Sequence, residues 1–98
     1  MPKGYWIANN LVRDPEGYEA YKRLNAVAFA KYGARFLVRA GAQEVPEGQM
    51  NPRSVVIEFP SYQAALDCYN SPEYQLALAA RVDISETNLA IVEGYDPE

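Results

Sequence analysis

The chain has 98 residues, 49% of them hydrophobic and 22% charged, a composition typical of a single globular domain, 1–98. Its net charge of −4 and its scattered basic residues disfavour nucleic-acid binding, which depends on clustered lysine and arginine. No apolar run approaches the ~20 residues that span a membrane, and the first residues lack the apolar stretch of a signal peptide. We therefore expect a cytoplasmic protein with neither a membrane nor a nucleic acid as partner.

The chain contains no histidine and one cysteine, Cys68. Histidine is the usual general base near neutral pH and the commonest transition-metal ligand, and one thiol permits no internal disulfide. No glycine-rich phosphate loop and no carboxylate cluster with metal-ligand spacing is found, so we expect no metal and no cofactor. Cys68 is interpreted as a small apolar residue on a helix, not a nucleophile.

The first predicted elements are a strand over 4–12 and a helix over 15–32. The strand is rich in aromatic and β-branched residues. Asp14 can cap the helix, and the fixed backbone of Pro15 suits its first position. Gly33 stands where a helix favours glycine at its C-terminal end.

Two further strands are predicted over 34–40 and 53–59. The loop between them is rich in Gly, Pro and Asn, as expected of a hairpin connection. A bulge at Gly41 would allow the earlier strand to continue to Val45.

The last part of the chain predicts helices over 62–69 and 72–82 and a strand over 88–94. Between the two helices, Asn70 can adopt the left-handed conformation that ends a helix. Ser71 can cap the second helix, and the proline that follows it disfavours helical backbone at Ser71.

The order strand, helix, strand, strand, helix pair, strand predicts a ferredoxin-like βαββαβ fold of the α+β class. Such a fold has a four-stranded antiparallel sheet with its helices on one face. Alternation along 53–59 places Val55, Ile57 and Phe59 on the apolar face beneath those helices.

The opposite face mixes apolar residues with Arg35, Arg39 and Glu58, if the strands alternate regularly. This face is too apolar to stand in water and too polar for an ordinary core. Two copies that face each other would bury it, so we expect a homodimer that closes a barrel sheet to sheet.

The stretches YGARFLVRAG, RSVVIEFPS and YNSPEYQ, followed by Arg81 and LAIVEG, resemble the bacterial family named domain of unknown function 1330. The resemblance extends over about residues 5–94. That family is similar in fold to the dimeric α/β barrel superfamily, which includes cofactor-free monooxygenases, muconolactone isomerase and haem-processing enzymes. The resemblance implies the fold and the dimer but no particular reaction.

Arg39 and Glu58 are the first candidate site residues, because regular alternation places both inside the barrel. They could form a pocket in which Arg39 binds an anion and Glu58 acts as a base. Alternatively, they form an ion pair that stabilises the dimer, since internal charges are usually paired. Arg53, at the start of its strand, is expected at the surface.

Aromatic residues are the second group of candidates, since eight tyrosines are many for this length. Tyr18, Tyr69 and Tyr74 on helices and Trp6 on the first strand could pack the core or line a pocket between helices and sheet. The corner YNSPEYQ would be the rim of that pocket. The function is then binding of a small organic ligand, or cofactor-free isomerase or monooxygenase chemistry on a hydrophobic or aromatic carboxylate.

Overall fold

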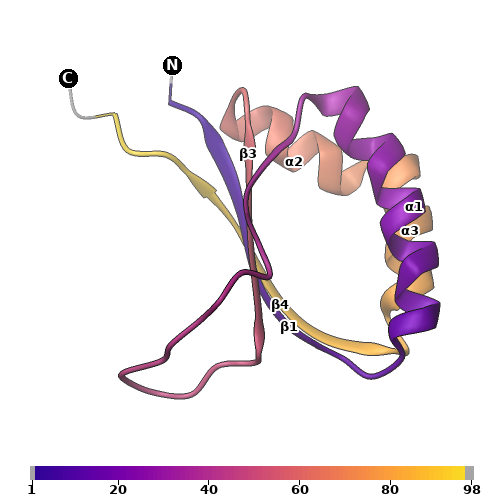
Figure 1. Cartoon of the computed structure of the whole chain (residues 1–98). Helices are drawn as coiled ribbons and strands as arrows, with labels where there is room; N and C mark the ends of the chain where they lie inside the picture. The colour runs from indigo at the N-terminus through magenta and orange to yellow at the C-terminus, as the bar shows by residue number, and fades with distance from the viewer. Residues whose placement is uncertain (1, 97–98) are drawn as a thin grey trace.

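The computed structural model describes residues 2–96. In chain order the elements are β1 (Gly4–Val12), α1 (Pro15–Tyr32), β2 (Arg35–Arg39), β3 (Arg53–Phe59), α2 (Tyr62–Asn70), α3 (Pro72–Arg81) and β4 (Ser85–Glu93). The strands form one antiparallel sheet in the order β2-β3-β1-β4, and the helices lie on one side of it, with α1 beside α3 (Figure 1). The ferredoxin-like α+β prediction is confirmed. None of the helices described is long and apolar enough to cross a membrane.

The ends of the helices follow local sequence signals. Asp14 accepts a hydrogen bond from the Gly17 N–H at 3.1 Å, and Gly33 ends α1 with a φ of 72°. Ser71, with φ −71° and ψ 151°, separates α2 from α3 and caps α3 through its hydroxyl. The left-handed conformation expected at Asn70 is wrong, since Asn70 remains helical. Extended backbone at Ser71, favoured by the proline after it, is enough to end α2.

The bulge in β2 lies at Leu37 and not at Gly41. Phe36 is opposite Ile57 in β3, whereas Val38 is opposite Val56, so β2 holds one extra residue between these two pairs. The alternation of side chains inverts after the bulge. The predicted continuation to Val45 is also wrong, because β2 ends at Arg39 and residues 41–52 form a largely exposed loop.

The core is built around Trp6, which is 1% exposed. Its Nε1 donates to the Ala65 carbonyl oxygen at 2.9 Å, which ties β1 to α2. Its ring has four aromatic neighbours with centroids 4.8–5.8 Å away: Phe29, Phe59, Tyr69 and Tyr74. These contacts fix the distance between the helices and the sheet.

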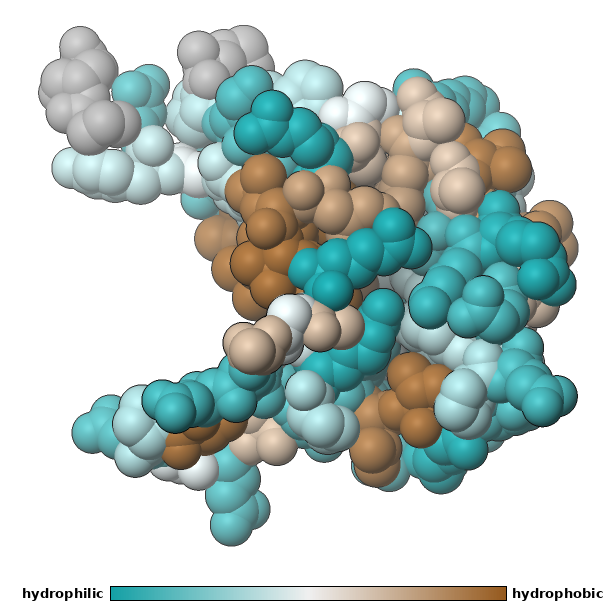
Figure 2. All heavy atoms as spheres, in the orientation of Figure 1, coloured by the Kyte–Doolittle hydropathy of each residue, from teal (hydrophilic) through white to brown (hydrophobic). Residues whose placement is uncertain are grey.

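No helix within residues 2–96 covers the other face of the sheet. Apolar side chains gather there, on the side of the molecule turned away from the helices (Figure 2). Ile7 in β1 is 49% exposed and Val92 in β4 is 40% exposed. We call this surface the open face. The sequence predicts that a second copy of the chain covers the exposed apolar groups of this face.

Candidate functional site

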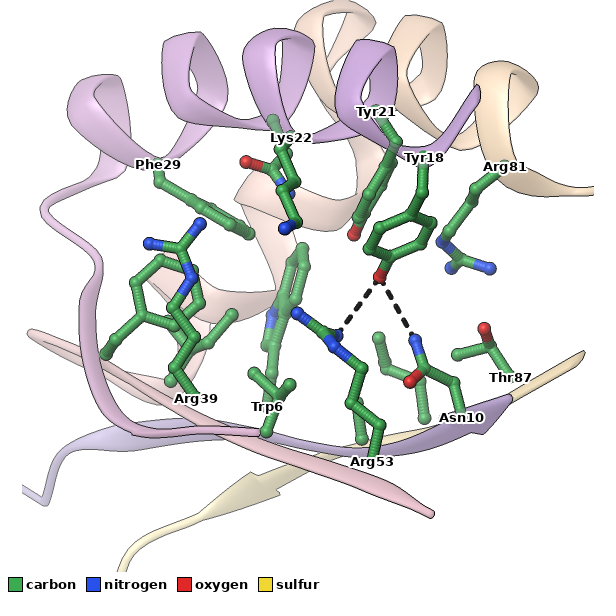
Figure 3. A pocket seen from close by; sticks show the side chains of 16 residues that line it. Trp6, Asn10, Tyr18, Tyr21, Lys22, Phe29, Arg39, Arg53, Arg81 and Thr87 are labelled. Carbon is green, nitrogen blue, oxygen red and sulfur yellow. Dashed lines mark hydrogen bonds between the residues drawn. The ribbon is translucent and has the colours of Figure 1, made fainter. Parts of the chain in front are cut away.

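A cleft lies between the helices and the sheet, opposite the open face, and 16 residues line it (Figure 3). Trp6, Ala8, Val55, Ile57 and Leu89 form its apolar floor on the sheet. Tyr18, Tyr21 and Phe29 of α1 form its roof. Its free volume is about 30 Å³, which is room for about two water molecules, so an organic ligand requires side chains to move.

The polar lining of the cleft is basic. Lys22, Arg39, Arg53 and Arg81 line it, and none of the lining residues is acidic. Lys22 pairs with Glu19 at 3.1 Å. The three arginines form no ion pair with a carboxylate within residues 2–96. In a chain with a net charge of −4, the cleft is therefore a local positive site.

Aromatic rings hold the three guanidinium groups. Arg39 lies 4.1 Å from the Phe36 ring centroid, Arg53 lies 5.2 Å from that of Tyr18, and Arg81 lies 5.4 Å from that of Tyr21. Arg81 is only 7% exposed. Buried charges usually have a partner of opposite sign, so a buried arginine held only by rings and hydroxyls suits an anionic ligand.

The Tyr18 hydroxyl takes part in two hydrogen bonds within the cleft. Its oxygen accepts from Asn10 Nδ2 at 3.0 Å and from Arg53 Nη1 at 3.3 Å (Figure 3). Burial is the main cause that raises the pKa of Tyr18, so the phenol keeps its proton at neutral pH. Asn10 is 3% exposed, and its Oδ1 has no hydrogen-bond partner among the described residues.

The structure separates the predicted aromatic candidates. Trp6 and Tyr18 line the cleft. Tyr69 and Tyr74 do not line it but pack against Trp6 in the core, and Tyr74 is fully buried. The corner YNSPEYQ is therefore not the rim of the cleft, because its two tyrosines turn inward toward Trp6.

The predicted juxtaposition of Arg39 and Glu58 is wrong. Arg39 is opposite Val55 on the helix-facing side and lines the cleft. Glu58 lies on the open face, where it accepts from Tyr5 Oη at 3.3 Å and lies 3.8 Å from Arg35 Nε. The bulge at Leu37 is the cause, since one extra residue moves Arg39 to the other face.

Several cleft residues were not among the predicted site residues. Arg53 was expected at the surface but is half-buried and lines the cleft with Tyr21 and Arg81. Helical spacing could have identified the cleft residues of α1, because they recur at positions 18, 21, 22, 25 and 29 on one face of the helix. Arg81 offered no such signal, since it enters the site only through the packing of α3 on α1.

Several solved structures are similar in fold. A protein of unknown function from Rhodopseudomonas palustris has a TM-score of 0.75 and 18% identity, over 98% of this chain and 85% of that one. SnoaB, a cofactor-independent oxygenase from Streptomyces nogalater, has a TM-score of 0.64 and 16% identity over the whole of both chains. A dimeric protein of unknown function and ferredoxin-like fold from Bacteroides fragilis has a TM-score of 0.61 and 16% identity, over 95% and 97%.

The family model described as Domain of unknown function (DUF1330) matches residues 3–95. A comparison with functionally curated proteins found no match. The structural similarities confirm the fold, and at these identities they say nothing further about the chemistry of the cleft.

Proposed function

Because the chain belongs to the family described as Domain of unknown function (DUF1330), for which the resemblance implies no reaction, we propose a function from the cleft itself. The protein binds a small organic anion with an apolar, aromatic body between the helices and the sheet. The observation that carries this proposal is the set of three arginines, Arg39, Arg53 and Arg81, which surround an apolar cleft without a carboxylate partner in residues 2–96.

Each part of such a ligand has a complementary surface in the cleft. The ring of the ligand suits the apolar floor around Trp6 and Val55. The negative group suits the end of the cleft where Arg53 and Arg81 lie near Tyr18 and Tyr21. Arg39, exposed at the mouth, can swing aside to admit the ligand. Few placed polar groups on an apolar lining are typical of small-molecule sites.

The fluorescence of Trp6 offers a direct test, since Trp6 is the single tryptophan of the chain and forms part of the cleft. We expect benzoate to change this fluorescence saturably and neutral benzamide to bind much more weakly. Arg53→Met should abolish the preference for benzoate. Arg23→Met, on the exposed side of the same helix as Tyr18, is the matched control and should retain it. Equal binding of the two compounds would contradict the proposal.

We further propose that the protein is a homodimer joined through the open faces. The exposed apolar groups of this face support the proposal, and so does the similar fold of the protein from Bacteroides fragilis, which is described as dimeric. Sedimentation equilibrium should give a dimer for the wild type and a monomer for Ile7→Asp. Val27→Asp is the control, since Val27 is 59% exposed on α1 and outside that face. A folded monomeric wild type at micromolar concentration would contradict the dimer.

A second candidate function is cofactor-free oxygenase or isomerase chemistry on an aromatic carboxylate. Its support is the similarity in fold to the oxygenase from Streptomyces nogalater. Binding alone is favoured here, because none of the 16 residues that line the cleft within 2–96 carries a carboxylate and the chain has no histidine to act as a base. Oxygen consumption or product formation with aromatic carboxylates would favour the enzyme. The cytoplasmic location stays a prediction.

A further inference from the structure

We propose that Tyr18 and Tyr21 act together as two hydroxyl donors that hold one ionised oxygen of the ligand. The pair selects the deprotonated form of an aromatic acid, a phenolate or a carboxylate, over the protonated form. This inference rests on the proposed function and adds which groups contact the anion. Arg53 and Arg81 then act mainly through the tyrosines.

The hydrogen bonds of Tyr18 leave its proton free. A phenol oxygen can accept two hydrogen bonds and donate one. Asn10 Nδ2 and Arg53 Nη1 donate to Tyr18 Oη at 3.0 and 3.3 Å and fill its two acceptor positions. None of the hydrogen bonds found within residues 2–96 uses the Tyr18 proton, so this proton is available to a ligand.

The hydrogen bonds of Tyr74 likewise leave the proton of Tyr21 free. Arg81 Nη2 donates to Tyr74 Oη at 3.2 Å, and the hydroxyl oxygens of Tyr74 and Tyr21 are 2.8 Å apart. If Tyr21 donated to Tyr74, the proton of Tyr74 would be fully buried with no acceptor in residues 2–96. The arrangement that satisfies Tyr74 has Tyr74 donate to Tyr21. The proton of Tyr21, which lines the cleft, is then left for the ligand.

The two free donors converge. Tyr18 and Tyr21 are three residues apart on α1 and therefore share one face of the helix. Their ring centroids are 4.9 Å apart, and both hydroxyls point from the helix toward the sheet (Figure 3). Arg53 donates a hydrogen bond to the Tyr18 oxygen. Arg81 donates to Tyr74, which in turn is paired with the Tyr21 hydroxyl. A cation that donates to a hydroxyl makes that hydroxyl a stronger donor.

Paired donors of this kind discriminate between ionisation states. An ionised oxygen accepts both hydrogen bonds about twice as strongly as a neutral one, because hydrogen bonds to an ion are charge-assisted, and a protonated oxygen also needs an acceptor for its own proton. Two hydroxyl donors with unused protons at one end of an apolar cleft indicate an acceptor atom of the ligand there.

The test uses 4-nitrophenol, whose phenolate absorbs visible light. Bound to the wild-type protein, the probe should be half-ionised at a pH at least about one unit below its value in water, which corresponds to about tenfold tighter binding of the phenolate. Tyr18→Phe and Tyr21→Phe should each reduce this preference about threefold or more. Tyr32→Phe is the control, since Tyr32 lies on the same helix but outside the cleft.

The outcomes separate this inference from the proposed function. If benzoate binds with dependence on Arg53 but both Tyr→Phe variants keep the wild-type preference, the arginines contact the anion directly and the tyrosine pair is overturned. The tyrosine pair is also overturned if 4-nitrophenol bound to the wild-type protein is half-ionised at the same pH as in water. If neither benzoate nor 4-nitrophenolate binds, the proposed function fails as well. The relative affinity of the two probes distinguishes a carboxylate ligand from a phenolate.

Discussion

Replacing Arg81 by methionine tests whether this arginine is kept for a ligand and not for stability. The change removes the hydrogen bond to Tyr74, worth about 1.5–3 kcal/mol for a charged donor, and a cation–π contact with Tyr21 worth up to about 2 kcal/mol. It also removes a charge that is only 7% exposed, and burying such a charge costs several kcal/mol. Tyr74 keeps its hydrogen bond with Tyr21.

These contributions nearly cancel, so we expect Arg81→Met to change the free energy of unfolding by no more than about 1 kcal/mol in either direction. For a domain of this size, that corresponds to a change in Tm of at most about 4–8 °C. Binding of the aromatic anion should weaken about threefold or more in the same variant. Weaker binding at unchanged stability is the expected signature of a residue kept for its site.

The assay is urea unfolding at one fixed protein concentration, because association of subunits would shift the apparent stability. Arg23→Met is the control, since Arg23 is exposed on α1, outside the open face, and its removal should change stability by less than about 0.5 kcal/mol. A loss of about 3 kcal/mol or more in Arg81→Met would show that Arg81 is a structural residue whose charge is compensated, and would refute the reasoning.

The remaining predictions concern the fold and its pH dependence. Burial raises the pKa of the Cys68 thiol from 9.0 to about 12, so the unfolded chain loses this proton first and stability falls as pH rises above about 9. Urea unfolding at about pH 8 and about pH 10 should show a smaller loss in Cys68→Ala than in the wild type, and equal losses would contradict a buried, protonated thiol. Gly4→Ala should destabilise by about 2 kcal/mol or more, because a Cβ there would clash with the Ser61 backbone oxygen. Gly41→Ala, with open space around it, is the control, and thermal unfolding is the measurement. A double-mutant cycle between Arg39 and Glu58 should give a coupling energy within about 0.5 kcal/mol of zero, since the two side chains lie on opposite faces, and a larger coupling would restore the ion pair.

Local signals in the sequence determined the elements and their order. Asp14, Gly33 and Ser71 act through their own side chains or backbone, so their effect on the helix ends can be read without knowledge of the rest of the fold. The alternation in β3 likewise placed Val55, Ile57 and Phe59 beneath the helices, as the structure has them. The resemblance to the family indicated the same fold.

The composition of the cleft was decided by tertiary structure. A single extra residue at Leu37 moves Arg39 from the open face to the cleft and leaves Glu58 behind. This bulge depends on how β2 pairs with β3. The residues of β2 alone are equally compatible with a regular strand. Arg53 and Arg81 are 28 positions apart in the sequence, and they converge only because α3 packs beside α1 over the sheet.

The sequence by itself therefore determined which elements form and which face of β3 lies beneath the helices, because helix caps and side-chain alternation depend on near neighbours. Only the tertiary structure decided which charges share a site. That outcome depends on strand register and helix packing, where a shift of one residue reverses the direction of a side chain.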